Sequence, residues 1–510
     1  MTKSYYQDEV DPLISSFDSP EAELSYLSGL AAATSARITR STQLLARIQR
    51  RYNQLQSPIH TLPFEILSSI FHIICPSDCE QRDVEESDRR WEVFREVNFS
   101  AIMLSSVSWH WRQVALATPK LWTSITLRMK SGKIRHHALL LQHYMARAKP
   151  LDISLDLLFS DFRGGTGFDL EYSRIYSILF AQGNAERIGV LRLYNPPLEW
   201  LSMVPMVSPL HTLCVEFPFD RPSDRSGAHL DLHFHSLRRL FLGGSNWALA
   251  HVPQSLKFLT LSRTPPEFDI HVLQQALELV ECHSDNPTEF QNVPDLLFDI
   301  PLVFNNLSSF TWSVGKGING GSAAQNLYLP ALKKLCLIAP EPVEGQPIID
   351  FIHKHAKTLH SLELNRFIEW SREEYFVLLF RYEMPCLHTV AVTSVILSGL
   401  VTCILALTPK EDELDEGSIP LPNLRFLRLE DDGNERYDEE MPQFGELVLN
   451  MLRVRRAGEH SEFHLDITDF EDDEDDIWPD YVQDGLTKYL ANHQVKITQK
   501  ERIPSWLESA

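Results

Sequence analysis

Two short segments contain residue types that suit metal or cofactor chemistry, and both fit a plainer explanation better. His72, Cys75 and Cys79 are potential zinc ligands, but no second pair follows at the spacing of a zinc site. The segment GKGING (315–320) matches GxGxxG, yet only nine residues separate it from Pro330. That stretch is too short for the helix of a nucleotide site, which favours a glycine-rich surface loop. We therefore expect no metal and no cofactor.

Carboxylates are abundant, but they fall in runs and not in the paired arrangement of a general acid and base. The runs occupy residues 411–416, 430–440 and 471–476, and such runs are typical of solvated loops. An acidic surface that attracts a basic protein target is the alternative, acting mainly through the association rate. The motifs GxSxG and HExxH and the Walker lysine do not occur. We therefore do not expect an enzyme.

Composition predicts a multidomain protein that does not bind nucleic acid. The chain has 510 residues, of which 44% are hydrophobic, and a formal net charge of −22. Phosphate binding needs clustered Lys and Arg, so nucleic acid is not expected as a partner. We expect no secretory signal, because the N-terminus lacks a basic start followed by an apolar run, and no membrane span, because no uninterrupted apolar run is near twenty residues long. The seven scattered cysteines are typical of reduced thiols in the cytoplasm or nucleus.

A short helix with an adhesive face is predicted at TLPFEILSSIF (61–71). Pro63 suits the first helical turn, where its missing N–H is not needed, and Thr61 is placed to cap the helix. Apolar residues recur in this segment at three- and four-residue spacing, which predicts an apolar stripe along one side. They are Leu62, Ile66, Leu67, Ile70 and Phe71.

A second segment with large apolar residues follows at SSVSWHWRQVALATPKLWTSITL (105–127). Val107, Trp111 and Val114 have near-helical spacing, and Pro119 ends the helical pattern ahead of Leu121 and Trp122. Together the two segments form a small helical unit with more large apolar groups than it can bury within itself. Such a surplus predicts a protein partner, although an ordinary two-helix piece of a larger core stays open as an alternative.

The two segments resemble the F-box, and the chain as a whole resembles the large fungal set of F-box proteins. In that set the box follows a short coiled-coil helix and precedes irregular leucine-rich repeats. The family pattern is LPxEIL and IF, then VC+xWR, then P.LW. Two departures are Ser108, where the family usually has cysteine, and a charged insertion at 76–98, which as a surface loop should be tolerated.

The resemblance implies a non-catalytic subunit of an SCF-type ubiquitin ligase. F-box proteins bind the adaptor Skp1 and, through it, a cullin, while the domain after the box holds a protein target. A target lysine is thereby held near activated ubiquitin, so that proximity accelerates the transfer. The Skp1-binding residues that the resemblance implies are Leu62, Pro63, Ile66, Leu67, Ile70, Phe71, Val107, Trp111, Pro119, Leu121 and Trp122. Some of these must form the core of the box itself, and sequence alone does not divide the two groups.

Ahead of the box, residues 20–56 are expected to form one long helix. Apolar residues recur there in an alternation of three and four that makes a heptad seam, which is weak at Thr34 and Ser41. We prefer a helix that packs back on its own chain over one that pairs with another copy or a partner. Five arginines between Arg37 and Arg51 make its outer face basic, as is typical of a solvated surface.

After the box the chain repeats imperfect phrases of the form L..L.L, at leucine-rich-repeat spacing. The first leucines stand mostly 19 to 28 residues apart, at positions 210, 237, 256, 307, 332, 359, 387 and 424. The last two positions of each phrase alternate in polarity and predict a short strand. A degenerate unit is expected near 277–284, and further strands at 122–127, 151–157, 188–194 and 462–467. One such unit cannot bury its face alone, so the phrases predict a stacked right-handed solenoid with a parallel sheet, whereas unrelated αβ elements are the alternative.

The predicted architecture is therefore multidomain α plus α/β. We expect a disordered N-terminus (1–18), a coiled-coil-like helix (19–56), a helical F-box (57–127), an irregular leucine-rich-repeat solenoid (128–470) and an acidic tail (471–510). The strand face is expected to expose Arg238, Lys257, Lys333, His360, His388 and Arg425 to the target. A Skp1-binding or repeat scaffold outside a cullin ligase is the alternative function, and the identity of the target lies beyond the sequence.

Overall fold

The computed structural model shows a mixed helix and strand protein with one large parallel sheet. It describes residues 19–498 except 57–58, 60–61, 76–99, 160–167, 182, 203, 205–206, 208, 218–227, 231, 233–234, 245–246, 250, 286–300, 315–325, 340–344, 368–369, 371–372, 409–418, 432–440, 457–462, 469–479 and 491–494. The chain divides into two compact units. Unit 1 comprises residues 1–90, 98–124 and 144–151, and unit 2 comprises 91–97, 125–143 and 152–510.

Unit 1 begins with the long helix that the heptad pattern predicts. Helix α1 spans Pro20–Gln56 and starts at the expected proline. Two glutamates in its first turn interact favourably with the positive end of the helix dipole. The side chains of its seam are mostly exposed, including Leu24, Ile38, Leu45 and Leu55. The preferred interpretation, a helix packed back on its own chain, is therefore not what the described residues of unit 1 show.

The predicted box segments form three short helices and a 3₁₀ turn in unit 1. These are α2 (Phe64–Ile74), α4 (Ser100–Val107), α5 (Trp109–Leu116) and η4 (Pro119–Trp122). Pro63 is the N-cap residue of α2, one position earlier than the first helical turn, and it makes no side-chain cap. Thr61 and the insertion at 76–98 lie outside the described residues.

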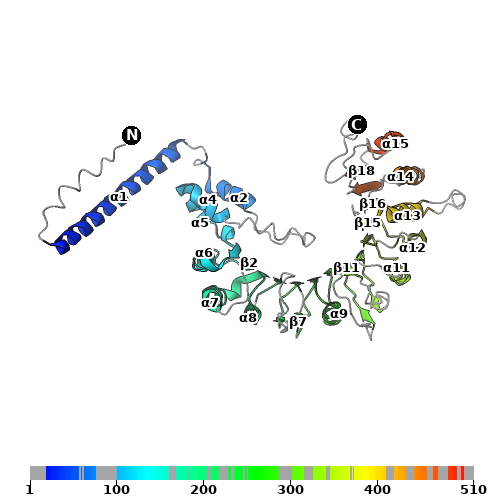
Figure 1. The fold of residues 1–510 in the computed structure, drawn as a ribbon, viewed down its shortest axis with the longest axis horizontal. Helices are drawn as coiled ribbons and strands as arrows, with labels where there is room; N and C mark the ends of the chain where they lie inside the picture. The colour runs from blue at the N-terminus through cyan, green and yellow to red at the C-terminus, as the bar shows by residue number, and fades with distance from the viewer. Residues whose placement is uncertain are drawn as a thin grey trace. The chain divides into compact units, whose positions relative to one another are not determined.

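Unit 2 is built on one sheet of fourteen strands (Figure 1). Its neighbours follow the chain order, and every adjacent pair from β2 to β18 is parallel. The strands are β1 (Ser124–Met129), β2 (Ile153–Phe159), β3 (Ile188–Tyr194), β4 (Thr212–Glu216), β6 (Arg239–Gly243), β8 (Phe258–Ser262), β9 (Glu281–Asp285), β11 (Ser309–Ser313), β13 (Lys334–Ile338), β14 (Ser361–Asn365), β15 (Thr389–Val395), β16 (Phe426–Asp431), β17 (His464–Thr468) and β18 (Val495–Thr498).

Leucine layers explain why these strands stack. Every first leucine of the eight predicted phrases is at most 2% exposed, and each phrase's strand begins two residues after it. The second and third apolar residues of each phrase are two positions apart on the strand, so both point to the same inner face. In register, Leu335 lies beside Leu362 and Leu337 beside Leu364. Each layer needs the layers beside it to bury its edges, which is the constraint that produces a continuous array.

The strand predictions are confirmed in position. All eight phrases form strands, the degenerate unit is β9, and the four further segments are β1, β2, β3 and β17. The sheet extends beyond the expected limits of the solenoid, because β1 begins at residue 124 and β18 follows residue 470. Two short pairs were not predicted: β5 (Ala228–Leu230) with β7 (Trp247–Leu249), and β10 (Leu302–Val303) with β12 (Leu327–Tyr328).

Helices follow many of the strands and lie together on one side of the unit 2 sheet (Figure 1). After α6 (Ile134–Arg147) they are α7 (Phe168–Leu179), α8 (Leu198–Leu201), α9 (Pro266–Gln275), α11 (Gly345–Lys354), α12 (Glu373–Phe380), α13 (Leu397–Leu407), α14 (Met441–Arg456) and α15 (Asp480–Leu490). Their apolar stripes cover the leucine layers; in α11, for example, Ile348, Ile349 and Ile352 are buried. The other face of the sheet carries the alternate strand residues.

A buried histidine joins helix α11 to the strand layer. His355 is 3% exposed; its Nε2 accepts the N–H of Leu329 at 3.1 Å, and its Nδ1 lies 2.9 Å from the carbonyl oxygen of Phe351. Only the neutral ring satisfies both contacts, with the proton on Nδ1. Burial lowers the pKa of His355 below its ordinary value.

Because the pKa of His355 is lowered in the native state, we expect unit 2 to lose stability in acid. As the pH falls below the unfolded pKa of about 6.5, the unfolded chain gains a proton that the native ring does not, so the free energy of unfolding decreases. The Tm of the wild type should fall more between about pH 7.5 and about pH 5.5 than that of His355→Gln. Differential scanning fluorimetry measures this, with the exposed His235→Gln as control. Equal pH slopes for wild type and His355→Gln would contradict the assignment.

Candidate protein-docking surfaces

The apolar side of α2 is divided between the core of unit 1 and its surface. Leu67 and Phe71 have no exposed area, whereas Ile66 is 49% and Ile73 is 80% exposed. At 100° per residue, Ile66, Ile70 and Ile73 lie within about 60° of one another on the helix, beside the buried pair. The helix therefore anchors one half of its apolar side and presents the other half to solvent.

Aromatic packing holds the buried half in place. The rings of Phe71 and Trp111 lie 5.0 Å apart between centroids, which joins α2 to α5. Trp122 donates its indole N–H to the carbonyl oxygen of Ala115 at 2.7 Å and packs edge-on against Tyr144 at 5.0 Å. Burial raises the pKa of Tyr144 to about 12, so the phenol is neutral at physiological pH.

Ser108, the position where the family pattern has cysteine, ends one helix and begins the next. Its backbone is extended and its Oγ accepts the N–H of Trp111 at 3.1 Å, an N-cap for α5. The helix expected through residues 107–116 is therefore two helices, α4 and α5. Ser68 and Thr118 lie within hydrogen-bond distance at 3.2 Å and link α2 to the end of α5.

The structure separates the sequence-predicted site residues into three groups. Buried within unit 1 are Leu67, Phe71, Leu121 and Trp122. Half-buried are Leu62, Ile70, Trp111 and Pro119. Exposed are Pro63, Ile66 and Val107. The first group forms the core that the sequence could not distinguish from a docking surface, and the third is free to contact a partner.

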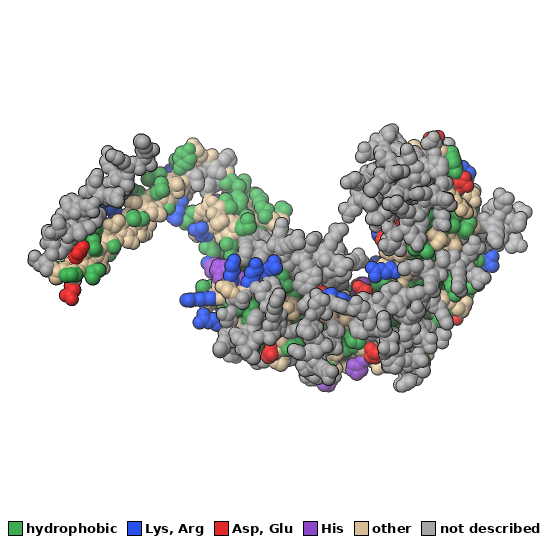
Figure 2. All heavy atoms as spheres, in the orientation of Figure 1, with side chains coloured by type: hydrophobic (Ala, Val, Ile, Leu, Met, Phe, Trp, Pro, Cys, Tyr) green, Lys and Arg blue, Asp and Glu red, His purple; other side chains and the backbone are tan. Residues whose placement is uncertain are grey.

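Several exposed apolar residues of the same helices were missed by the sequence reasoning. They are Phe64, Ile73, Ile74, Met103 and Trp109. Ile73 is seven residues after Ile66 on α2, so the same periodicity could have found it had the stripe been followed past Phe71. Figure 2 shows apolar side chains gathered at the surface over α2 and α4. A group of adjoining exposed apolar residues marks an interaction surface more often than a single exposed one does.

The cofactor and metal candidates gain nothing from the structure. His72 and Cys75 lie at the end of α2, and Cys79, the GKGING segment and most of the acidic runs fall outside the described residues. Burial, with Lys120 nearby, lowers the pKa of His72. Among the described residues no three His, Cys, Asp or Glu side chains are grouped as metal ligands. The predicted absence of a metal or cofactor stays a prediction.

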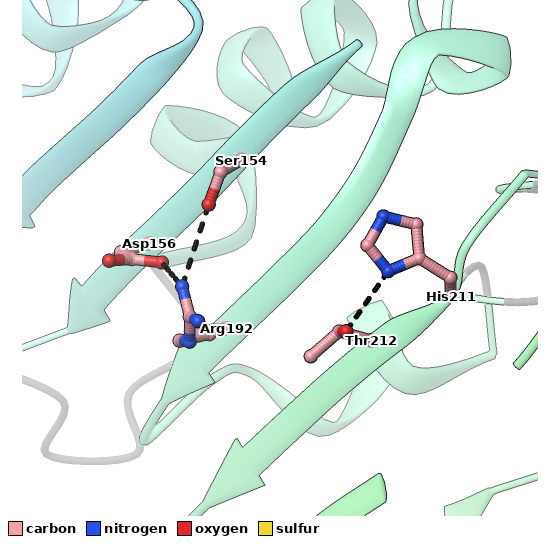
Figure 3. Close-up of polar contacts among 5 residues, drawn as sticks. All are labelled: Ser154, Asp156, Arg192, His211 and Thr212. Carbon is pink, nitrogen blue, oxygen red and sulfur yellow. Dashed lines mark hydrogen bonds and ion pairs between the residues drawn. The ribbon is translucent and has the colours of Figure 1, made fainter. Parts of the chain in front are cut away.

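Two ion pairs link charged side chains on or next to the strands of unit 2. Arg192 on β3 reaches Asp156 on β2 at 3.1 Å and Ser154 at 3.5 Å, as Figure 3 shows. A second pair joins Arg263 and Glu216 at 2.6 Å. The first pair joins the neighbouring strands β2 and β3, and the second spans from the end of β4 past β6 to the residue after β8. Because these side chains are mostly buried, the pairs hold the strand ends together and do not form an open catalytic group.

A row of cationic and histidine side chains runs along the amino-terminal edge of the same sheet. The basic row consists of the residues immediately before β6, β8, β13, β14, β15 and β16: Arg238, Lys257, Lys333, His360, His388 and Arg425. Backbone hydrogen bonds align its members; the N–H of His360 donates to Lys333 at 2.8 Å and that of Arg425 to His388 at 2.8 Å. Val280 and Ser308 continue the row across β9 and β11.

The basic row differs from its expected place in one respect. Its residues lie at the edge where the strands begin, and not on the outer strand face. In each repeat the first residue on that outer face is the one that follows the row member. Arg238, Lys333, His360 and Arg425 are exposed, whereas Lys257 and His388 are half-buried. Lys257 pairs with Glu278 at 3.2 Å, a partly exposed contact that contributes little.

Comparison with known protein families and with curated proteins finds no match for this chain. In the part that the structure describes, no helix combines the length and apolar character needed to cross a bilayer. The functional conclusion therefore depends on the geometry of these surfaces and on the motifs in the sequence.

The N-cap at Ser108 predicts a local stability effect. Ser108→Ala removes the acceptor for the Trp111 N–H and should destabilise α5 by about 1 kcal/mol, whereas Ser108→Asp should retain the cap. Amide hydrogen exchange of residues 109–116 measures the change. Ser106→Ala is the control, because that exposed hydroxyl only donates within its own helix to Met103. Unchanged exchange in Ser108→Ala would show that the cap does not stabilise α5.

Proposed function

We propose that this chain is the substrate-recognition subunit of an SCF-type E3 ubiquitin ligase. On this proposal unit 1 contains an F-box that binds a Skp1-like adaptor, and the repeats of unit 2 bind a protein target. The observation that carries it is the divided apolar side of α2: Leu67 and Phe71 are fully buried beside an exposed Ile66 and Ile73. A helix with this division is anchored on one side and available for docking on the other.

Burial of the exposed half would provide the driving force for adaptor binding. Fully burying an isoleucine side chain stabilises a complex by roughly 1.5–3 kcal/mol, and Ile66, Ile73, Met103 and Val107 each keep about half or more of their surface exposed. The well-packed core behind them, from Phe71 to Trp122, fixes their positions before binding, which reduces the entropy lost on association. The surface is therefore suited to a stable partner.

The chain itself is proposed to be non-catalytic. Its contribution would be to hold a target near the ubiquitin-conjugating enzyme recruited through the cullin, which raises the effective concentration of the target lysine. The proposal places the protein in the cytoplasm, the nucleus or both. It includes no cofactor, no nucleic acid and no membrane.

The basic row supports an acidic segment as the target of unit 2. Across the eight strands from β6 to β16 the row extends about 34 Å, at about 4.8 Å per strand. About ten residues of extended polypeptide cover that distance. The exposed cations stand out in a chain whose net charge is −22, and complementary charge along a row favours both the rate and the register of binding.

Substitutions in α2 test adaptor binding. Ile66→Asp together with Ile73→Asp places unpaired carboxylates in the proposed contact and should weaken binding of a purified Skp1-type adaptor by well over tenfold, which is 1.4 kcal/mol. The wild-type fold should be kept, because both residues are exposed. Surface plasmon resonance with purified proteins measures the affinity.

Ala36→Asp with Gln43→Asp, at two exposed positions of α1, is the control with the same change of two charges. Adaptor binding that survives the isoleucine variants would refute the proposed contact. Copurification of tagged wild type then shows whether a cullin joins the complex. Adaptor without cullin would favour a scaffold outside the ligase.

Charge reversal tests the target surface. Arg238→Glu, Lys333→Glu and Arg425→Glu should weaken binding of a fluorescent deca-glutamate peptide by at least about tenfold, and the wild-type affinity should fall steeply with salt. Fluorescence anisotropy measures both. The control reverses Arg135, Arg174 and Arg453, three exposed arginines on α6, α7 and α14, for the same net charge change. Equal losses in the two triple variants would mean that net charge alone, and not the row, attracts the peptide.

A further inference from the structure

Helix α1 exposes an apolar seam that nothing in the described part of unit 1 covers. Six large seam side chains are between 54% and 70% exposed: Leu24, Ile38, Leu45, Ile48, Tyr52 and Leu55. A single helix of 37 residues cannot bury such a seam by itself. Helices with this alternation of three and four residues gain stability by pairing along the seam.

The sizes of the seam residues distinguish between the possible directions of pairing. The seam reads Leu24, Leu27, Ala31, Thr34, Ile38, Ser41, Leu45, Ile48, Tyr52 and Leu55. In a parallel pair of identical helices in register, Ala31, Thr34 and Ser41 would each face their own copy, leaving small or hydroxylated layers at the centre. Reversing one helix about the midpoint places Ala31 opposite Ile48, Thr34 opposite Leu45 and Ser41 opposite Ile38. Every small residue then faces a large one, as close packing requires.

The charges of α1 favour the same direction. The acidic residues of the helix are Glu21 and Glu23, in its first turn, and its basic residues lie between Arg37 and Arg51. A parallel pair would align the arginines of one helix with those of the other and the glutamates likewise. A reversed pair brings Glu21 and Glu23 of each helix towards Arg47, Arg50 and Arg51 of the other, and it also opposes the two helix dipoles. Arg37 and Arg40 lie close to the midpoint and therefore near their own copies in either direction.

We propose that α1 pairs with α1 of a second copy of this chain as an antiparallel coiled coil. In the proposed register residue 24 faces residue 55 of the other copy, and each pair of facing positions sums to 79. The arrangement is isologous, because the same surface is used twice around a two-fold axis. It is independent of adaptor binding, since it uses no residue of the exposed α2 surface.

The consequence is a receptor with two target-binding arrays. A target, or a target assembly, with two acidic segments would bind the second array at an effective concentration set by the linkage, which raises avidity without any new contact. This consequence alone depends on the proposed function, whereas the pairing itself does not.

Cysteine cross-linking of the full chain tests the pairing and its direction. Leu24→Cys combined with Leu55→Cys should form a disulfide-linked dimer under mild oxidation, seen on non-reducing gels, because the two positions are adjacent across the seam. Each single variant should stay uncross-linked, since identical positions then lie roughly 46 Å apart along the helices. The wild type controls for the native cysteines. Cross-linking of the single variants would instead demonstrate a parallel pair and overturn the proposed direction.

Oligomeric state tests the pairing without engineered cysteines. The wild type should be dimeric by light scattering coupled to gel filtration, and Leu45→Asp with Ile48→Asp should make it monomeric. Ala36→Asp with Gln43→Asp is the matched control on the opposite side of the helix, and it should stay dimeric. A monomeric wild type would overturn the proposal, whereas loss of adaptor binding with the dimer intact would affect only the function proposed above.

Discussion

Helix α2 has more apolar surface than its own unit can cover, and this surplus is the constraint on which the functional account depends. The helix is eleven residues long, and its apolar side extends over about half of its circumference. One half of that side belongs to the core of the unit, where Phe71 packs against Trp111. The other half, with Ile66 and Ile73, is held at the surface by the same packing. Stability and docking are thus two uses of a single helix.

Unit 2 buries its apolar strand residues by stacking similar repeats. A strand with one apolar layer, such as Leu335 and Leu337 on β13, is buried by the equivalent apolar residues of the strands on either side, together with the helices that cover the sheet. This fixes the inward residues and leaves the edge positions free to differ from repeat to repeat. At six of eight consecutive edge positions from β6 to β16 the chain carries Lys, Arg or His, so a repetitive core produces an extended charged surface from residues far apart in sequence.

The periodic elements of this fold were predictable from the sequence. Which of their apolar residues are buried and which are exposed was not. The heptad of α1 gave its bounds, and the first leucine of each phrase gave the start of a strand, because both patterns reflect burial directly. The break at Ser108 was missed because helical spacing continues across it; only the hydroxyl contact with the Trp111 N–H reveals it. Leu67 and Ile66 are equally apolar neighbours, and only packing shows that one is core and the other surface. β18 escaped notice because Val495 and Ile497 stand in a polar tail without a leading leucine.

Calorimetric titration of the purified full chain with a purified Skp1-type adaptor tests the central claim most directly. The account predicts a saturable complex with one adaptor per chain and a negative heat-capacity change, because apolar surface on α2, α4 and α5 leaves water. Absence of a complex between the two folded proteins, or binding whose heat capacity does not change, would contradict it.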